Sequence, residues 1–170
     1  MYMKTAILFL AASVVALPTA QDGNHKRAAV LTKQSYADFQ VSDGVAGNAL
    51  AEVQAKFPID ENDLANVDPA DAQIISDARE VAESAEVDTG GFNDAIAAAS
   101  GADADALQVG KIKNKVLKLK LEVLDLQIQQ AQGGKDNTDK IAQEQKKLDN
   151  NIATDKKSAG DASQAVDFQG

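Results

Sequence analysis

Acidic residues crowd the segment 60–71, and closely spaced oxygen-bearing side chains are what a calcium-binding loop uses. The segment begins Asp60-Glu61-Asn62-Asp63, and Asp68 and Asp71 follow. The pattern departs from a calcium loop because Leu64 occupies the fifth position, and the glycine of the sixth and the glutamate of the twelfth position are missing. Such a composition is typical of helix caps and solvated turns. We therefore predict no metal site.

The chain lacks the residues on which most nucleophilic catalysis depends. It has no cysteine, and its single histidine is His25, so a chain without its first 27 residues has neither a histidine triad nor a histidine- or thiolate-ligated metal. Carboxylate pairs are available for a glycosidase, but the chain has no tryptophan and few aromatic platforms for sugar rings. We predict no enzymatic activity, no catalytic residues and no cofactor. The alternative is a hydrolase of an unrecognised class with two close carboxylates in a cleft.

The N-terminus has the pattern of a secretory signal peptide over 1–20. A short basic start ending at Lys4 precedes 13 apolar residues, which are too few to span a bilayer. Cleavage is expected after Ala20, with Ala16 as the alternative. The segment 21–27 then ends in the dibasic pair Lys26-Arg27, which resembles the site of subtilisin-like processing proteases of the fungal Golgi; the alternative is an uncut basic spot.

Charge divides the remaining chain into two unlike parts. Residues 28–108 hold 16 acids and 3 bases, a net charge of −13, whereas residues 109–170 hold 9 acids and 11 bases, a net charge of +2. An overall acidic chain is unsuited to nucleic acid, because phosphate neutralisation needs a basic surface. We favour charge complementarity within one domain over a split binding surface.

The only basic cluster comprises Lys111, Lys113, Lys115, Lys118 and Lys120. At helical spacing only Lys111, Lys115 and Lys118 share the polar face, and acidic residues follow on it. We interpret the cluster as a solvated face or as a partner for the acidic part; an anionic lipid or polysaccharide is the alternative ligand.

Helical signals recur along the chain. Ser42-Asp43 is predicted to cap a helix that ends before Pro58, and Asp68-Pro69 is a strong start signal for a helix reaching about Val87. Glycines 90 and 91 break that helix, and a short alanine-rich helix follows over 92–99. The tail 159–170 is predicted to be loosely ordered, with Val166 or Phe168 docked.

The strongest helical pattern lies in the C-terminal third. Apolar residues repeat at alternating spacings of three and four from Val109 to Leu126, and a second apolar row lies beside them. A glycine-containing turn then leads to a second helix, which must run antiparallel. The predicted fold is an all-α bundle of about five helices with a long hairpin of about 103–132 and 138–158, in a single domain over 28–170. A strand over 117–123, where apolar and charged residues alternate, is the alternative.

Four blocks of the sequence resemble a family of small secreted proteins of filamentous ascomycetes. The blocks are YADFQVSDGVAGNALAE (36–52), GFNDAI (91–96), GKIKNKVLKL (110–119) and EQKKLDNNI (144–152). The family includes a conidial cell-wall protein of aspergilli that shields spores from immune recognition. The resemblance implies a secreted protein of the cell wall or spore surface without enzymatic activity, and it supplies no catalytic residues; other such proteins are described as effector-like.

These observations predict a secreted, non-enzymatic cell-wall or spore-surface protein that covers or masks the fungal surface from host recognition. The alternative is a released effector that binds a host partner through a helical surface; apolar-ligand carriage inside the bundle ranks below both. The predicted partner is a cell-wall polymer or a host protein, without nucleic acid and without a transmembrane segment in the mature chain. The heptad face of 109–126 could also pair between copies of the chain. An accessible apolar seam on this helix would favour the effector, whereas burial of both rows would leave no obvious groove.

Overall fold

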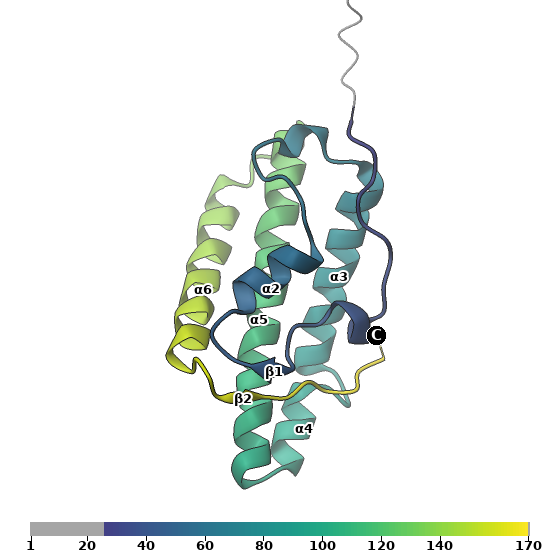
Figure 1. The fold of residues 1–170 in the computed structure, drawn as a ribbon. Helices are drawn as coiled ribbons and strands as arrows, with labels where there is room; N and C mark the ends of the chain where they lie inside the picture. The colour runs from purple at the N-terminus through teal and green to yellow at the C-terminus, as the bar shows by residue number, and fades with distance from the viewer. Residues whose placement is uncertain (1–25, 170) are drawn as a thin grey trace, which may run out of the picture.

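The computed structural model describes residues 26–169 and is mainly helical (Figure 1). Five of its helices have seven residues or more: α2 (Ala49–Lys56), α3 (Pro69–Val87), α4 (Phe92–Ala98), α5 (Gly101–Ala131) and α6 (Thr138–Lys157). The shorter elements are α1 (Tyr36–Phe39), the 3-10 turn η1 (Leu64–Asn66) and the strands β1 (Gly44–Val45) and β2 (Ala162–Ser163). The predicted all-α bundle is confirmed. The predicted signal peptide, with Ala20, and residues 21–25 lie outside the described residues.

The long helix α5 is the centre of the bundle. Figure 1 shows α3 on one side of α5, α6 on the other and α2 crossing in front. Both apolar rows of α5 are buried or half-buried, because α3 and α6 cover them from two directions. The predicted hairpin is therefore confirmed, and the alternative of a strand over 117–123 is wrong, since these residues lie in the middle of α5. Among residues 26–169, no helix has both the length and the apolar content that crossing a membrane requires.

Local signals placed the start of α3 correctly. Asp68 is its N-cap and accepts a hydrogen bond from the main-chain N–H of Ala70 at 2.8 Å, while Pro69 occupies the first helical position. At its other end, Gly90 has a φ of +82°, a conformation that favours glycine and turns the chain toward α4. The start of α5 differs slightly from the prediction, since the helix begins at Gly101.

The predicted start of α2 is wrong. The helix begins at Ala49, and the residues assigned to its first turns instead form a loop in which Gly44 pairs with Ser163 and Val45 with Ala162. Gly47 has a φ of +114°, which is incompatible with a helix and unfavourable for other residues. The Asp43 carboxylate, predicted as a cap, accepts a hydrogen bond from Ala165 N–H at 2.8 Å.

The C-terminal tail is held on the bundle, which corrects the prediction of a loosely ordered segment. After α6 the chain crosses in front of α5 and ends beside α1 (Figure 1). Gly110 allows this approach, because a β-carbon there would lie 2.0 Å from the carbonyl oxygen of Gln164. Val166 and Phe168 pack against the core as predicted, and the ring of Phe168 meets that of Tyr36 edge to face at 6.0 Å between centroids.

Candidate functional site

Four of the five lysines of α5 are bound by acidic residues from the other part of the chain, whereas Lys111 donates to Asn93 Oδ1 at 2.6 Å. The ion pairs are Lys113–Glu52 at 2.9 Å, Lys115–Glu86 at 3.4 Å, Lys118–Glu83 at 3.0 Å, Lys118–Glu86 at 2.7 Å and Lys120–Glu61 at 2.7 Å. All four glutamates belong to residues 28–108. The interpretation of the basic cluster as a partner for the acidic part is confirmed for these four lysines, and their charge is largely neutralised within the chain.

Glu86 is the most enclosed carboxylate of these pairs, with 10% of its side chain exposed. Burial alone would raise its pKa, but the hydrogen bond from Lys118 and the charges of Lys118 and Lys115 lower the pKa of Glu86 below its usual range. For Lys118, burial alone would lower the pKa, but its hydrogen bonds to Glu86 and Glu83 raise the pKa above the usual value. Both groups are therefore held in their charged forms.

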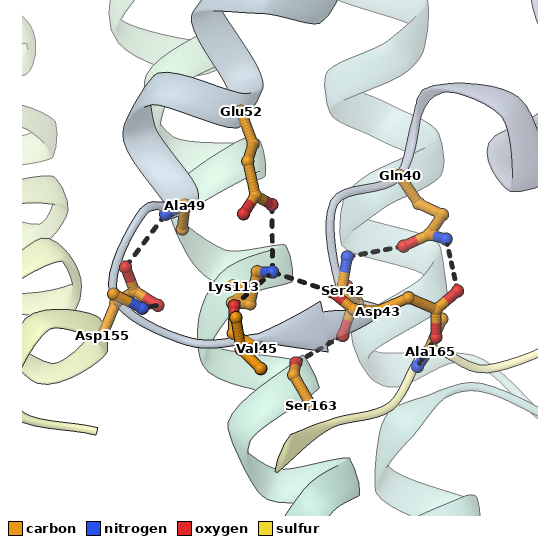
Figure 2. Close-up of polar contacts among 11 residues, drawn as sticks. Gln40, Ser42, Asp43, Val45, Ala49, Glu52, Lys113, Asp155, Ser163 and Ala165 are labelled. Atoms are coloured by element: carbon orange, nitrogen blue, oxygen red, sulfur yellow. Dashed lines mark hydrogen bonds and ion pairs between the residues drawn. The ribbon is translucent and has the colours of Figure 1, made fainter. Parts of the chain in front are cut away.

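Lys113 differs from its neighbours because its side chain is completely buried. Its ammonium group donates to the carbonyl oxygens of Asp43 at 2.9 Å and Val45 at 3.0 Å, and it also pairs with Glu52 (Figure 2). A buried charge needs such partners, since transfer from water without them is strongly unfavourable. Lys113 thereby fixes the loop before α2 to the middle of α5.

Asp155 of α6 fixes the other side of the same loop. Its carboxylate accepts hydrogen bonds from Gly47 N–H at 2.9 Å and Ala49 N–H at 3.0 Å, and the residue is 2% exposed (Figure 2). The bond to Ala49 satisfies a free N–H at the start of α2, while the adjacent Asn48 makes no side-chain cap. The close approach depends on Gly47, where a β-carbon would lie 2.8 Å from that of Ala159.

We call residues 40–48 and 158–165, with Lys113 and Asp155 between them, the clamp. The tail joins the loop through β1 and β2 and through the Ser163 hydroxyl, which donates to the carbonyl oxygen of Ser42 (Figure 2). Gly160 N–H donates to Ala46 O at 3.1 Å, and Ala46 N–H donates to Asp161 O at 3.0 Å. The clamp thus ties α2, α5, α6 and the tail together through main-chain groups.

A second buried contact joins α1 to the bundle. The Tyr36 hydroxyl donates to Asn114 Oδ1 at 2.9 Å, and Asn114 Nδ2 donates to Ala82 O at 2.8 Å. Burial raises the pKa of Tyr36 to about 12, because the phenolate would lose its hydration. The hydroxyl is a structural donor rather than an acid that titrates near neutral pH.

The acidic segment 60–71 binds the N-terminal part of the described chain. Asp71 is 2% exposed and accepts hydrogen bonds from Val30 N–H and Leu31 N–H at 2.8 to 3.1 Å. We call the extended residues 27–35 the strap, which Figure 1 shows running beside α3. Of the predicted processing residues, Arg27 begins the strap and Lys26 directly precedes it, and both contact the domain. Among residues 26–169, no three potential metal-ligating side chains converge.

Two of the hollows on the surface of residues 26–169 contain carboxylates that other side chains bind. The first hollow, of about 450 Å³, lies between the strap, α1, the end of α2 and the middle of α3. In this hollow, Asp77 accepts a hydrogen bond from Gln73 at 2.7 Å and Glu80 pairs with Arg79 at 2.9 Å.

The second hollow, of about 470 Å³, lies among charged residues of α3, α5 and α6. Burial and the nearby Glu122 raise the pKa of Asp125, but Asp125 lines neither hollow. Glu122 lines the second hollow and is paired with Arg79 at 3.1 Å and Lys140 at 2.6 Å.

Sequence reasoning missed the clamp, although one signal pointed to it. Lys113 and Lys120 fall outside the polar face of α5, so the helical periodicity already placed two lysines among apolar neighbours. Their structural exposures of 0% and 9% agree with that position. No comparable signal marked Asp155, because α6 is polar around most of its surface.

Comparison with known proteins gives a family and no function. The family model described as Domain of unknown function (DUF8454) matches residues 31–167, which include every described helix and both strands. No curated protein and no solved structure matches the chain.

Proposed function

The chain belongs to the DUF8454 family of domains of unknown function, and from that premise we propose that it is a secreted, non-enzymatic protein of the fungal cell wall or spore surface. Its task in this proposal is to cover underlying polymer and mask it from host recognition. The resemblance of four sequence blocks to small secreted proteins of ascomycetes supports the location. The character of the molecular surface supports the role of a covering.

The observation that carries the proposal is the burial of both apolar rows of α5 inside the chain. Val116, Leu119 and Val123 of the first row are at most 6% exposed, and four residues of the second row are buried as well: Leu117, Leu121, Leu124 and Ile128. Among residues 26–169, the exposed large apolar side chains are Val30, Val45 and Val87, which lie on separate elements. Among the described residues the exposed large apolar side chains lie apart from one another, which suits a protein that coats without adhering to apolar partners.

The same observation weighs against an effector that presents the apolar seam of a helix. Helix-in-groove recognition needs an apolar face that a partner can reach, and the heptad face of 109–126 packs against α3 and α6 of its own chain. Pairing of this face between copies of the chain would require the bundle to open. A host partner would instead have to bind polar side chains.

Localisation in the producing fungus tests the proposal. An epitope inserted between Gly134 and Lys135 lies in the exposed turn between α5 and α6, away from the clamp. We expect the tagged protein on isolated walls or spores, and we expect spores without the gene to be recognised more strongly by immune cells. Recovery from the medium alone, with unchanged spore recognition, would contradict the proposal.

The mode of retention can be tested on the same walls. A charged surface that adheres without a covalent bond should be released by high salt, because salt screens contacts between exposed charges. At about 1 M salt the screening length falls to about 3 Å. We expect this concentration to release most of the tagged protein. The inserted epitope carried by an unrelated secreted protein is the control for trapping in the wall.

A further inference from the structure

The residues at the predicted processing site are bound to the folded domain. The Arg27 guanidinium pairs with Asp60 at 2.9 Å and Asp63 at 2.6 Å, and its main-chain N–H donates to Asn66 O at 2.8 Å. The neighbouring Lys26 ammonium donates to Gln132 Oε1 at 3.1 Å. We propose that the folded domain protects the Arg27–Ala28 peptide bond, so that a dibasic-specific protease cuts it only before the strap docks or after it detaches.

The first reason is competition for the guanidinium group. A protease that selects arginine recognises it with carboxylates, which bind the planar guanidinium through charge-assisted hydrogen bonds. Asp60 and Asp63 already bind the same group. The N–H of Asn62 and the Arg27 guanidinium lower the pKa of Asp60, so its carboxylate stays ionised in mildly acidic compartments. The two aspartates therefore compete with the recognition pocket of the protease.

The second reason is the conformation of the main chain after the cut site. Proteases bind their substrates in extended form and need free main-chain groups on both sides of the bond, which makes local detachment a condition for cleavage. Here Val30 and Leu31, three and four residues beyond Arg27, donate their N–H groups to the buried Asp71 carboxylate. Leu31 also packs against the core. Detaching the strap would expose both the leucine and the Asp71 carboxylate.

Cleavage would remove one of the two attachments and leave the other. Hydrolysis consumes one water molecule and produces a carboxylate on Arg27 and an ammonium group on Ala28. The contacts of Arg27 with Asp60 and Asp63 would leave with the released segment, whereas the bonds from Val30 and Leu31 to Asp71 would stay with the domain. The strap is therefore expected to remain docked on a chain that begins at Ala28.

The test is a cleavage time course on the purified chain that retains residues 21–27. A subtilisin-like dibasic-specific protease is added under native conditions, and mass spectrometry follows the product that begins at Ala28. A peptide of residues 21–35 serves as the unprotected substrate. We expect the folded chain to be cut at least about tenfold more slowly than the peptide, because opening of the strap limits the rate. Equal rates for the two substrates would overturn the proposal.

Variants assign the protection to named contacts. The double variant Asp60→Asn/Asp63→Asn should be cut about fivefold faster than the unaltered chain, as expected for two exposed ion pairs, and Asp71→Asn should be cut faster still. The matched control Asp103→Asn/Asp105→Asn makes the same charge change at the start of α5 and should leave the rate unchanged. If the first double variant is cut no faster than this control, the proposal is wrong.

The chain contains its own reporters of general unfolding. Lys146-Lys147 and Lys156-Lys157 are dibasic pairs within α6, so a protease reaches them only when that helix opens. We expect the faster cleavage of the variants to occur after Arg27 alone. Cleavage after Lys147 at the same increased rate would overturn the proposal, because the gain would then come from global unfolding.

Discussion

The helical bundle and the segments that wrap it are stabilised in different ways. In the bundle, α3 and α5 bury apolar rows, and α6 adds the buried Leu148 and the half-buried Ile141 and Ile152. The clamp and the strap contain few large apolar residues, and buried charged side chains hold them by binding their main-chain groups. Lys113 binds two carbonyl oxygens, while Asp71 and Asp155 each bind two N–H groups. Irregular chain leaves main-chain groups that need partners, whereas a helix satisfies most of its own.

The difference shows how a chain without cysteine can fix its non-helical segments. A disulfide would tie such a segment covalently, but the sequence has no cysteine. Each of the three charged residues is at most 2% exposed and connects a wrapping segment to a helix of the bundle. Removing a charge of this kind leaves main-chain groups without hydrogen-bond partners. We therefore expect it to lower the free energy of unfolding and also to loosen the wrapping segment that the charge binds.

The largest expected effect is in the bundle. Leu117 is fully buried, so Leu117→Ala should lower the free energy of unfolding by about 4 kcal/mol through lost apolar burial and the remaining cavity. Urea denaturation followed by circular dichroism measures this change. The control is Val87→Ala, at an exposed position, which should change stability by less than about 0.5 kcal/mol. A small effect of Leu117→Ala would show that apolar packing is not the main stabilising interaction of the bundle.

In the clamp, Lys113→Met is expected to lower the free energy of unfolding by about 3 kcal/mol, because two buried carbonyl oxygens lose their donor. Hydrogen exchange should show the loss first at the amides of Ala46 and Gly160, which bond across the clamp. Lys111→Met is the matched control, since Lys111 is half-buried on the same helix. Uniform loss of protection across α5 and the clamp would mean that the two regions are a single cooperative unit.

The same contrast explains which parts of the fold the sequence predicted. Asp68-Pro69 marked the start of α3 and the apolar rows marked α5, because these signals lie within the helices that they specify. The start of α2 was missed because the carboxylate that caps Ala49 belongs to Asp155, 106 residues away. The sequence did not predict that the C-terminal tail is ordered, because Ala165 bonds to Asp43, 122 residues away. Periodicity and capping motifs contain no information on such distant contacts.

The predicted processing residues show a similar limit. The pair Lys26-Arg27 is recognisable from its residue types alone. Its attachment is not, because Asp60, Asp63 and Gln132 meet it only in the folded chain. The acidic segment 60–71 departs from a calcium loop at its fifth, sixth and twelfth positions. The sequence pattern did not predict that Asp71 binds the strap, because a buried aspartate and an exposed helix-capping aspartate have the same residue type.

Tyr36, at the junction between the wrapping segments and the bundle, gives a spectroscopic test. The chain has two tyrosines, and only Tyr36 remains in a chain beginning at Ala28. Ultraviolet absorbance should therefore report one ionisation with a midpoint near 12, against 10.0 for an exposed tyrosine. Because the folded state binds the proton more tightly, stability should fall by about 2 to 3 kcal/mol as the pH rises from 10 to 12.

Tyr36→Phe is the control for this alkaline loss. The variant removes the ionisation, so the part of the pH dependence that belongs to Tyr36 should disappear between pH 10 and 12. A midpoint near 10 in the unaltered chain, with the fold intact by circular dichroism, would show that water reaches the hydroxyl and that the junction opens readily.

The smallest expected effect concerns a charge of the bundle itself. Glu86→Gln should lower the free energy of unfolding by about 1 kcal/mol near neutral pH, since it removes the charge that binds Lys115 and Lys118 on neighbouring turns of α5. The pKa of Glu86 is lowered in the folded state, so its contribution is fully present above its usual value of 4.5 and is lost as the pH falls through the folded value. The difference in the free energy of unfolding between the variant and the unaltered chain should therefore shrink below pH 4.5.

Glu80→Gln is the control, because the Glu80 side chain is 68% exposed in its pair with Arg79 and should contribute almost nothing. If Glu86→Gln were as damaging as Lys113→Met, then buried charge would stabilise the bundle as strongly as it stabilises the clamp, and the two regions would not differ in the way proposed here.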